Sequence, residues 1–272
     1  MVISLSTQAQ HSWFKTENHK DELFLGWGWN RASFTNSDIH FTGDGYDFTL
    51  LDVKAKDRQT AFKAETYFGL KTMTIPQTNL RVGYFLNNHF AITGGVDHMK
   101  YVMTQNQTVE FEGEIGDTSY NSIISGNQIV LKENFLRFEH TDGLNYINAE
   151  LEYHQGIFSS HKFLLKAYGG AGLGALLPKS NVTLMKYPRN DEFHLAGYGL
   201  SAKVGMEFVF WRHFFIRFEY KTGFINMPDI VTRKASIDDR AAQHFFFAQR
   251  NGMFGFTLPL HKKVKPIITG NE

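Results

Sequence analysis

Residues 198–224 read YGLSAKVGMEFVFWRHFFIRFEYKTGF, and their side chains alternate between two chemical classes. The even positions are apolar and largely aromatic: Tyr198, Leu200, Ala202, Val204, Met206, Phe208, Phe210, Phe214, Ile216, Phe218, Tyr220 and Phe224. The odd positions are small or charged: Ser201, Lys203, Gly205, Glu207, Arg217, Glu219, Lys221 and Gly223. Alternation with a period of two, broken by a tight turn at Trp211-Arg212-His213, predicts two long antiparallel strands.

Both arms of this hairpin reach the roughly 9–11 residues that a strand needs to cross a bilayer, whereas soluble strands average about 5–6. A continuous apolar face opposite a charged face is typical of a membrane barrel, in which the first faces lipid and the second faces the lumen. A three-residue turn places Glu207 opposite Arg217 and Lys203 opposite Lys221. The soluble alternative is a lipocalin-like barrel, in which the aromatic face would line a core.

Composition excludes several classes of protein. The chain has 272 residues and a net charge of +1, which argues against a dedicated nucleic-acid binder. It has no cysteine, so disulfides, thiolate zinc sites and thiol catalysis are excluded. The 12 histidines show no metal-ligand spacing, and we expect no metal and no cofactor. No apolar run is long enough for a transmembrane helix.

Similar alternation recurs along most of the chain. It predicts an all-β, antiparallel up-and-down transmembrane β-barrel of about twelve strands over residues 23–260, or ten if the weak segments 59–70 and 107–116 are not strands. Residues 1–22 form an N-terminal lead, in which Thr7-Gln8-Ala9 resembles the end of a secretory signal or belongs to a polar tail. Residues 261–272 form a polar C-terminal tail.

The connections predict the orientation of the barrel. Asn87-Asn88, residues 156–160 and residues 211–213 are short turns expected on the periplasmic side, and the polar segments 34–45, 177–193 and 226–240 are outer loops. Residues 140–143 read as a further tight turn, and residues 116–127 as a long periplasmic connection.

The whole pattern resembles the Gram-negative outer-membrane β-barrel proteins. Leu164 to Pro178 looks like the glycine-rich strand that leads into an outer loop of small porin-like barrels, and Arg250 to Leu258 looks like a barrel-closing strand. The resemblance implies a location in the outer membrane of a Gram-negative bacterium. It also implies contact with outer-membrane lipid and with the outer-membrane assembly machinery.

The charged face defines the candidate lumen-lining residues. They are Lys63, Glu65, Arg81, Glu150, Glu152, Lys166, Lys203, Glu207, Arg217, Glu219 and Lys221, and Glu133 and Arg137 belong to the same pattern. Charges of both signs either fill a narrow barrel with ion pairs or line a channel that binds or passes small polar solutes.

The alternative function is a membrane-embedded hydrolase of the lipid A deacylase or phospholipase type, which would need a serine beside a histidine and a carboxylate. The candidates are His140 with Asp142, His98 beside Asp97, His244, and Ser159-Ser160-His161. No motif of a catalytic family surrounds them, so the sequence favours a barrel without enzymatic activity.

Overall fold

The structure is a computed structural model that describes residues 19–69, 71–72, 75–160, 162–234, 236 and 238–260. The predicted signal end near Ala9 and the tail at 261–272 lie outside the described residues. In the described part of the chain, no helix is both long and apolar enough to cross a membrane.

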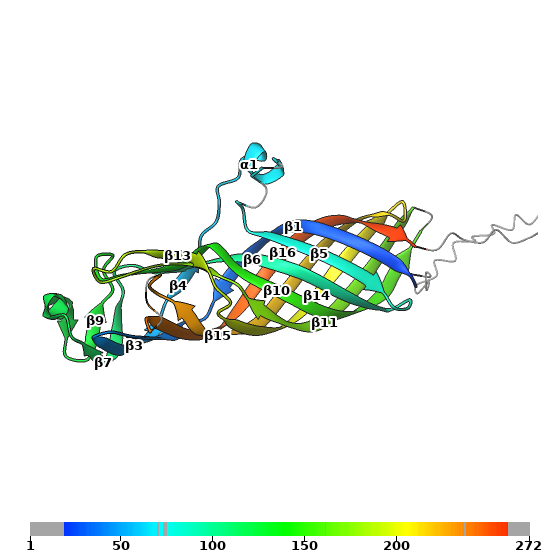
Figure 1. The fold of residues 1–272 in the computed structure, drawn as a ribbon. Coiled ribbons are helices and arrows are strands. Elements are labelled where there is room, and N and C mark those ends of the chain that lie inside the picture. Colours follow the sequence, from blue (N-terminus) through cyan, green and yellow to red (C-terminus); the bar gives the residue numbers. More distant parts are fainter. Residues whose placement is uncertain are drawn as a thin grey trace, which may run out of the picture.

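Eight long strands of the described chain form a closed antiparallel ring (Figure 1). They are β1 (Glu22–Phe34), β5 (Thr78–Phe85), β6 (Phe90–Met103), β10 (Leu136–Ser159), β11 (Phe163–Leu176), β14 (Gly197–Phe210), β15 (Phe214–Val231) and β16 (Arg240–Pro259). Each pairs with its neighbour in this order, and β16 pairs with β1 to close the ring. The predicted transmembrane β-barrel is therefore confirmed as a fold, but its ring has eight strands where about twelve were predicted.

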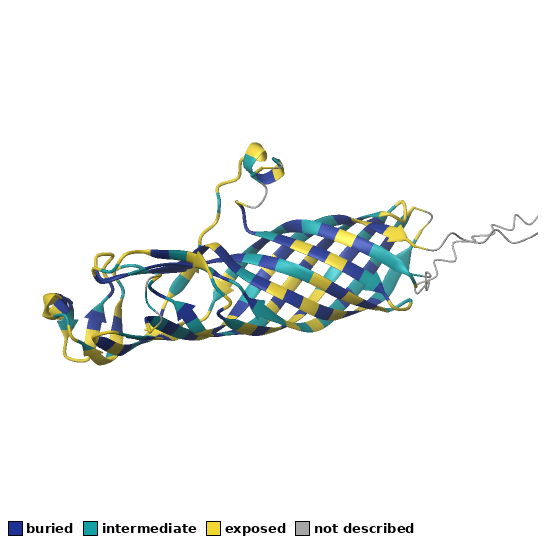
Figure 2. Cartoon of the chain, in the orientation of Figure 1, coloured by how far each residue is buried: buried dark blue, intermediate teal, exposed yellow. Residues whose placement is uncertain are grey.

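The β14–β15 hairpin has the register that the charge pattern predicts. Glu207 pairs with Arg217 and Lys203 pairs with Lys221 across the two strands. Burial alternates residue by residue along most of the ring strands, which gives the checkered surface in Figure 2. Because side chains of a strand point alternately to its two faces, the charged residues point into the barrel and the apolar ones point outward.

Short and long connections separate the two ends of the barrel. Short turns at residues 86–89 and 211–213 join ring strands at one end, where β10 also ends at Ser159 and β11 begins at Phe163. The strand β1 begins and β16 ends at this same end. The other four connections are longer and lie at the opposite end. We call the short-turn end periplasmic and the long-loop end outer, following the rule for bacterial barrels.

The outer connections contain regular structure in segments that were predicted as loops or as barrel strands. Their strands are β2 (Ser37–Gly43), β3 (Tyr46–Val53), β4 (Ala55–Asp57), β7 (Thr108–Ile115), β8 (Ile124–Ser125), β9 (Gln128–Val130), β12 (Lys179–Leu184) and β13 (Asn190–Phe193). Together with a 3-10 helix at Thr118–Ile123 they form the outer extension, which continues the barrel beyond its long-loop end (Figure 1).

Four predictions are corrected here. The predicted strand at 59–70 is not found among its described residues 59–69, which contain the short helix α1 (Ala64–Phe68). Residues 107–116 contain β7, which belongs to the extension and not to the ring. Residues 140–143 are no turn, since β10 runs through them with a register shift between His140 and Leu144. Residues 116–127 lie in the outer extension and not on the periplasmic side.

The outer extension has a large apolar core. Buried rings of Phe41, Phe48 and Phe138 pack together, with centroids of Phe41 and Phe48 5.2 Å apart and those of Phe41 and Phe138 5.7 Å apart. Tyr101 and Phe245 stack at 5.1 Å in the same core. The extension therefore folds as a packed body on top of the barrel.

Candidate functional site

The inward faces of the ring strands carry ten charged side chains that are almost completely buried. They are five cations, Arg81, Lys166, Lys203, Arg217 and Lys221, and five carboxylates, Asp97, Glu150, Glu152, Glu207 and Glu219. We call this set the lumen charge network. Its formal charges cancel, because each sign occurs five times.

The periplasmic half of the network centres on Glu207. Its carboxylate accepts from Nε of Arg217 and forms an ion pair with Nζ of Lys166. Arg217 then lies 3.5 Å from Glu152 through Nη1, and its guanidinium carbon lies 4.2 Å from the ring centroid of Phe24. Arg217 thus connects two carboxylates and packs on an aromatic face, an arrangement that suits a planar guanidinium.

The middle of the network centres on Lys203. Its Nζ lies 2.5 Å from Glu150, 2.6 Å from Glu152 and 3.3 Å from Glu219. The Nδ2 group of Asn251 donates to Glu219 at 2.7 Å. Strands β10, β14, β15 and β16 are therefore linked across the barrel interior by charged and polar contacts.

The outer half of the network centres on Asp97. Arg81 Nη2 lies 2.5 Å from one carboxylate oxygen of Asp97, and Lys221 Nζ lies 2.6 Å from the other. The amides of Asn79 and Asn148 donate to the same carboxylate at 2.5 and 3.0 Å. Lys221 also pairs with Glu150 at 2.6 Å, which joins this half to the middle.

Removing charges from water costs several kcal/mol per ion, and ion pairs offset this cost only when their geometry is good and the remaining polar atoms are bonded. Every one of the ten charged groups has at least one partner of opposite sign within 3.5 Å. The network therefore fills the lumen with groups that are difficult to separate or replace one at a time.

Apolar side chains lie at both ends of the network. Toward the periplasmic end, six buried residues form a cluster: Phe24, Phe85, Ala91, Leu164, Val209 and Phe215. Toward the outer end lies the core of the extension. An eight-stranded barrel has an interior just wide enough for side chains to fill it, and this barrel is filled by a charged layer between two apolar layers.

The structure brings nine of the eleven sequence-predicted lumen residues together in the network. The prediction is wrong for Lys63 and Glu65, which lie at and in α1, outside the barrel and exposed. Glu133 and Arg137 lie at the outer extension, where they form an exposed pair at 3.9 Å. Lys63, Glu65 and Glu133 belong to the outer connections, and Arg137 lies at the outer end of β10.

Asp97 is the network residue that sequence reasoning missed. In the sequence the phase of residues 89–103 is ambiguous, because either His98 and Lys100 or Asp97 and Met99 would face lipid. The structure resolves the conflict, since β6 continues past the barrel and both side chains lie near the outer extension. The small inward residues Ala91, Thr93 and Gly95 were the signal that fixes the phase.

A serine and a histidine do meet in the outer extension. His140 Nδ1 lies 2.9 Å from Ser180 Oγ, and both side chains are buried. Burial lowers the pKa of His140 to about 4, so its ring is neutral at neutral pH. Among the described residues no carboxylate bonds to this histidine, so the pair lacks the third member of a catalytic triad.

The other catalytic candidates are separate from one another. Asp142 pairs with Lys179 at 3.1 Å, His98 bonds to Asn145 at 2.9 Å, and Asp97 belongs to the lumen charge network. His244 is exposed beside the ring of Phe224, with ring centroids 6.0 Å apart. Ser159 and Ser160 lie at the periplasmic turn, and His161 is outside the described residues. The described residues contain no cluster of metal-ligating side chains.

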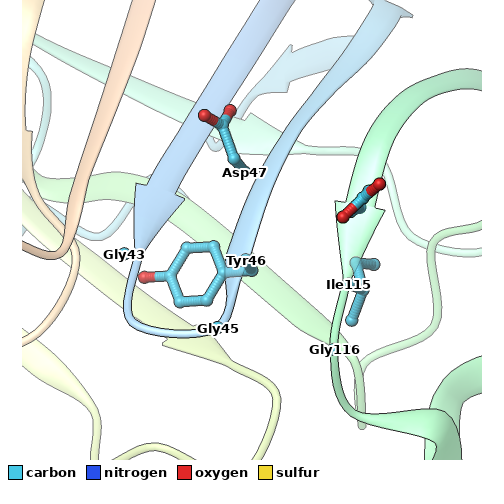
Figure 3. A pocket seen from close by; sticks show the side chains of 7 residues that line it. Gly43, Gly45, Tyr46, Asp47, Ile115 and Gly116 are labelled. Carbon is cyan, nitrogen blue, oxygen red and sulfur yellow. The ribbon is translucent and has the colours of Figure 1, made fainter.

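An open pocket lies at the tip of the outer extension, where the β2–β3 turn meets the end of β7 (Figure 3). Tyr46 lines it together with Asp47, Glu114, Ile115 and three glycines at positions 43, 45 and 116. Tyr46 donates to Asp239 at 2.6 Å, and burial with this carboxylate raises the pKa of the phenol above its usual value. Figure 3 shows the side chain of Asp47 directed away from the Tyr46 ring.

Comparison with known proteins gives a family. Residues 1–240 match the model of the outer membrane protein beta-barrel domain. No curated protein matches the chain.

Solved structures with similar folds are outer-membrane proteins of low sequence identity. OprG from Pseudomonas aeruginosa shares 10% identity at a TM-score of 0.41, covering 88% of this chain and 97% of its own. AlkL shares 11% sequence identity at a TM-score of 0.41, and the match covers 91% of this chain and 94% of AlkL. Ail of Yersinia pestis shares 10% sequence identity at a TM-score of 0.32, and the match covers 88% of this chain and 99% of Ail. The family match covers most of the sequence, and it agrees with the closed ring and its apolar outer face. The chain therefore belongs to the outer membrane protein beta-barrel domain family and resides in the outer membrane of a Gram-negative bacterium.

Proposed function

We propose that the protein is a structural outer-membrane barrel that closes its own lumen and holds the outer extension at the cell surface. The observation that carries this proposal is the neutral lumen charge network, enclosed between two apolar layers. A barrel filled in this way is a rigid support, and its outer extension is the part that faces other molecules.

The passage of small polar solutes is a second candidate, favoured by the polar character of the lumen. It requires the network to open. A solute on the barrel axis would have to separate Lys203 from Glu150 and Glu152, which lie 2.5 and 2.6 Å from its Nζ. Breaking a buried pair by removing one partner costs about 3–5 kcal/mol, and several pairs would have to open together. The closed barrel is therefore the better supported proposal.

Conductance in planar bilayers distinguishes these candidates. Native protein is reconstituted, and its insertion is verified by the mobility shift that boiling produces on a gel. We expect no stepwise conductance from the inserted native barrel. Regular unitary steps would overturn the closed-barrel proposal and favour the channel.

The matched variant is Lys203→Ala combined with Glu152→Ala, which removes one cation and one carboxylate from the centre of the network. If the network is what closes the lumen, this neutral double variant conducts small ions while the native barrel does not. The variant must first show the same boiling-dependent mobility as the native protein.

The hydrolase alternative is favoured by one observation, the contact between His140 and Ser180. Both side chains are buried in the extension core, so a lipid ester cannot reach Ser180 Oγ without opening of that core. Incubation of the folded protein with phospholipid and lipid A, followed by analysis of released fatty acid, tests it. We expect no release, and release that Ser180→Ala abolishes would establish the hydrolase.

A further inference from the structure

Two arginines face each other on the outward surface of the barrel. Arg31 of β1 and Arg250 of β16 are direct cross-strand partners. Their chain neighbours Asn30 and Asn251 are buried inside the barrel, so both guanidinium groups point outward. Arg250 is exposed and Arg31 is half-buried.

Neither guanidinium group forms an ion pair with a carboxylate among the described residues. Arg31 donates to the carbonyl of Asn30 at 3.1 Å and to the hydroxyl of Tyr67 at 3.4 Å. Asp57 interacts electrostatically with Arg31 but uses its oxygens to accept from the Ala32 N–H and the Gln77 amide. Among the described residues Arg250 has no ion pair. Like charges directly across a sheet are unfavourable, so this pair is suited to an anion that binds both.

The height of the pair on the barrel identifies the environment of that anion. On the outward face of β16, the positions from Gly252 to Leu258 are apolar, and Arg250 comes directly before them. Eight residues at about 3.4 Å each, on a strand tilted by about 40°, correspond to a height of about 21 Å. The apolar band of such barrels is about 25 Å tall, so the arginines lie near its outer edge.

Aromatic side chains border the pair on both sides. Trp29 precedes Arg31 on the outward face and packs on Phe68 and Tyr67 of α1, with ring centroids 5.2 and 5.7 Å apart. Tyr220 is the β15 partner of Arg250. Tryptophan and tyrosine concentrate where lipid tails meet head groups. The aromatic border therefore places the arginines at head-group level.

The segment that carries α1 is fixed against the barrel beside this pair. Lys100 Nζ donates to the carbonyl of Ile75 at 2.7 Å and to the hydroxyl of Thr60 at 3.1 Å. These bonds hold both ends of the segment, and α1 projects beside the outer half of the barrel (Figure 1). Tyr67 is thereby kept beside Arg31, so the site has one wall supplied by α1.

We propose that Arg31 and Arg250 bind the phosphate group of a lipid head group in the outer leaflet of the outer membrane. A guanidinium donates two parallel hydrogen bonds to phosphate oxygens, and two facing guanidinium groups match a doubly charged phosphate. The apolar surface below the pair, Trp27 and Phe254 among it, accommodates the acyl chains of the same lipid, with the rings of these two residues 5.4 Å apart.

Native mass spectrometry of the full chain in mild detergent tests the proposal, with diphosphorylated lipid A as the probe. The variant is Arg31→Gln with Arg250→Gln. The control is Lys54→Gln with Lys132→Gln, which removes the same charge from two exposed side chains of the outer connections. We expect the native protein and the control to bind the lipid equally. We expect the arginine variant to bind it at least about tenfold more weakly, because it lacks the charge-assisted hydrogen bonds from both guanidinium groups to the phosphate.

Two further measurements distinguish the source of the phosphate. Dephosphorylated lipid A should bind about as weakly to the native protein as the phosphorylated lipid binds to the arginine variant, and excess inorganic phosphate should not displace the lipid. Any one of three results would overturn the proposal. The native protein would bind lipid A equally well with and without its phosphates, the arginine variant would bind phosphorylated lipid A as tightly as the native protein does, or inorganic phosphate would displace the lipid. Should the double variant fail to fold, Arg250→Gln alone replaces it, because Arg250 makes no ion pair within the described chain.

Discussion

Glu207 and Arg217 lie directly opposite each other in the β14–β15 hairpin, and the Arg217 Nε donates to the Glu207 carboxylate inside the barrel. Lys166 of β11 contacts the same carboxylate from the other side, and Glu207 is its carboxylate partner in the described chain. One carboxylate thus neutralises two cations on neighbouring strands. Lys166 therefore depends on Glu207 alone among the described carboxylates, whereas Glu207 has Arg217 as a second partner.

Glu207→Gln should destabilise the barrel far more than Lys166→Met. The first leaves Lys166 buried with no carboxylate, and removal of one partner of a buried pair costs about 3–5 kcal/mol. The second leaves Glu207 paired with Arg217. Urea unfolding in detergent micelles, followed by tryptophan fluorescence, measures the difference.

The double variant Glu207→Gln with Lys166→Met is the control for that comparison. It removes the unpaired cation, so it should be more stable than Glu207→Gln alone. An additive loss in the double variant would show that the ion pair is not the cause of the effect.

Gly83→Ala should destabilise the barrel, because a Cβ at this inward position would lie 2.1 Å from the ring of Phe24. Overpacking of this kind typically costs about 1–3 kcal/mol. Gly94→Ala is the matched control: it lies on the adjacent strand β6, and a Cβ there meets no atom within 4 Å. The unfolding midpoint of Gly94→Ala should equal or exceed that of the native protein. Equal losses of stability in Gly83→Ala and Gly94→Ala would contradict close packing around Phe24 in the periplasmic layer.

Lowering the pH should weaken the outer extension through His140. Burial holds the pKa of this histidine at about 4, against about 6.5 in an unfolded chain. The folded state therefore loses stability as the pH falls from about 6.5 to about 4, because the unfolded chain takes up a proton first. The full loss is about 3 kcal/mol.

Thermal unfolding of the native protein and of His140→Gln at several pH values checks this assignment. Buried Tyr101, whose pKa burial raises to about 12, faces His140 with ring centroids 5.6 Å apart and stays neutral throughout this range. The difference in unfolding temperature between the native protein and His140→Gln should grow smaller or reverse as the pH falls below 6.5. A difference that does not depend on pH would exclude His140 as the titrating group.

The sequence was sufficient to predict the barrel, its hairpin register and most of the lumen charge network, because a period of two assigns each side chain to a face once one strand is placed. Glu150, Glu152 and Lys203 were identified in this way. The strand number could not be predicted, because the outer strands β3 and β7 alternate like ring strands. The apolar residues of these two strands pack in the core of the extension. Alternation alone does not show whether an apolar face contacts a protein core or lipid. Which charges pair with which also depends on contacts across the barrel, as between Lys203 and Glu150, which no local pattern encodes.

Ser180→Ala should reduce stability without affecting any hydrolytic rate. The substitution removes the hydroxyl that lies 2.9 Å from His140 Nδ1, and a buried polar atom left without a partner costs about 1–3 kcal/mol. The loss should appear as a lower unfolding temperature of the outer extension, which limited proteolysis of the intact cells can follow as faster cleavage of the surface-exposed loops. Asn121→Ala, in the exposed part of the 3-10 helix, is the control and should not change the cleavage rate at that core. Unchanged stability in Ser180→Ala together with a lost lipid-hydrolysing activity would contradict the structural role of the pair and would assign it to catalysis.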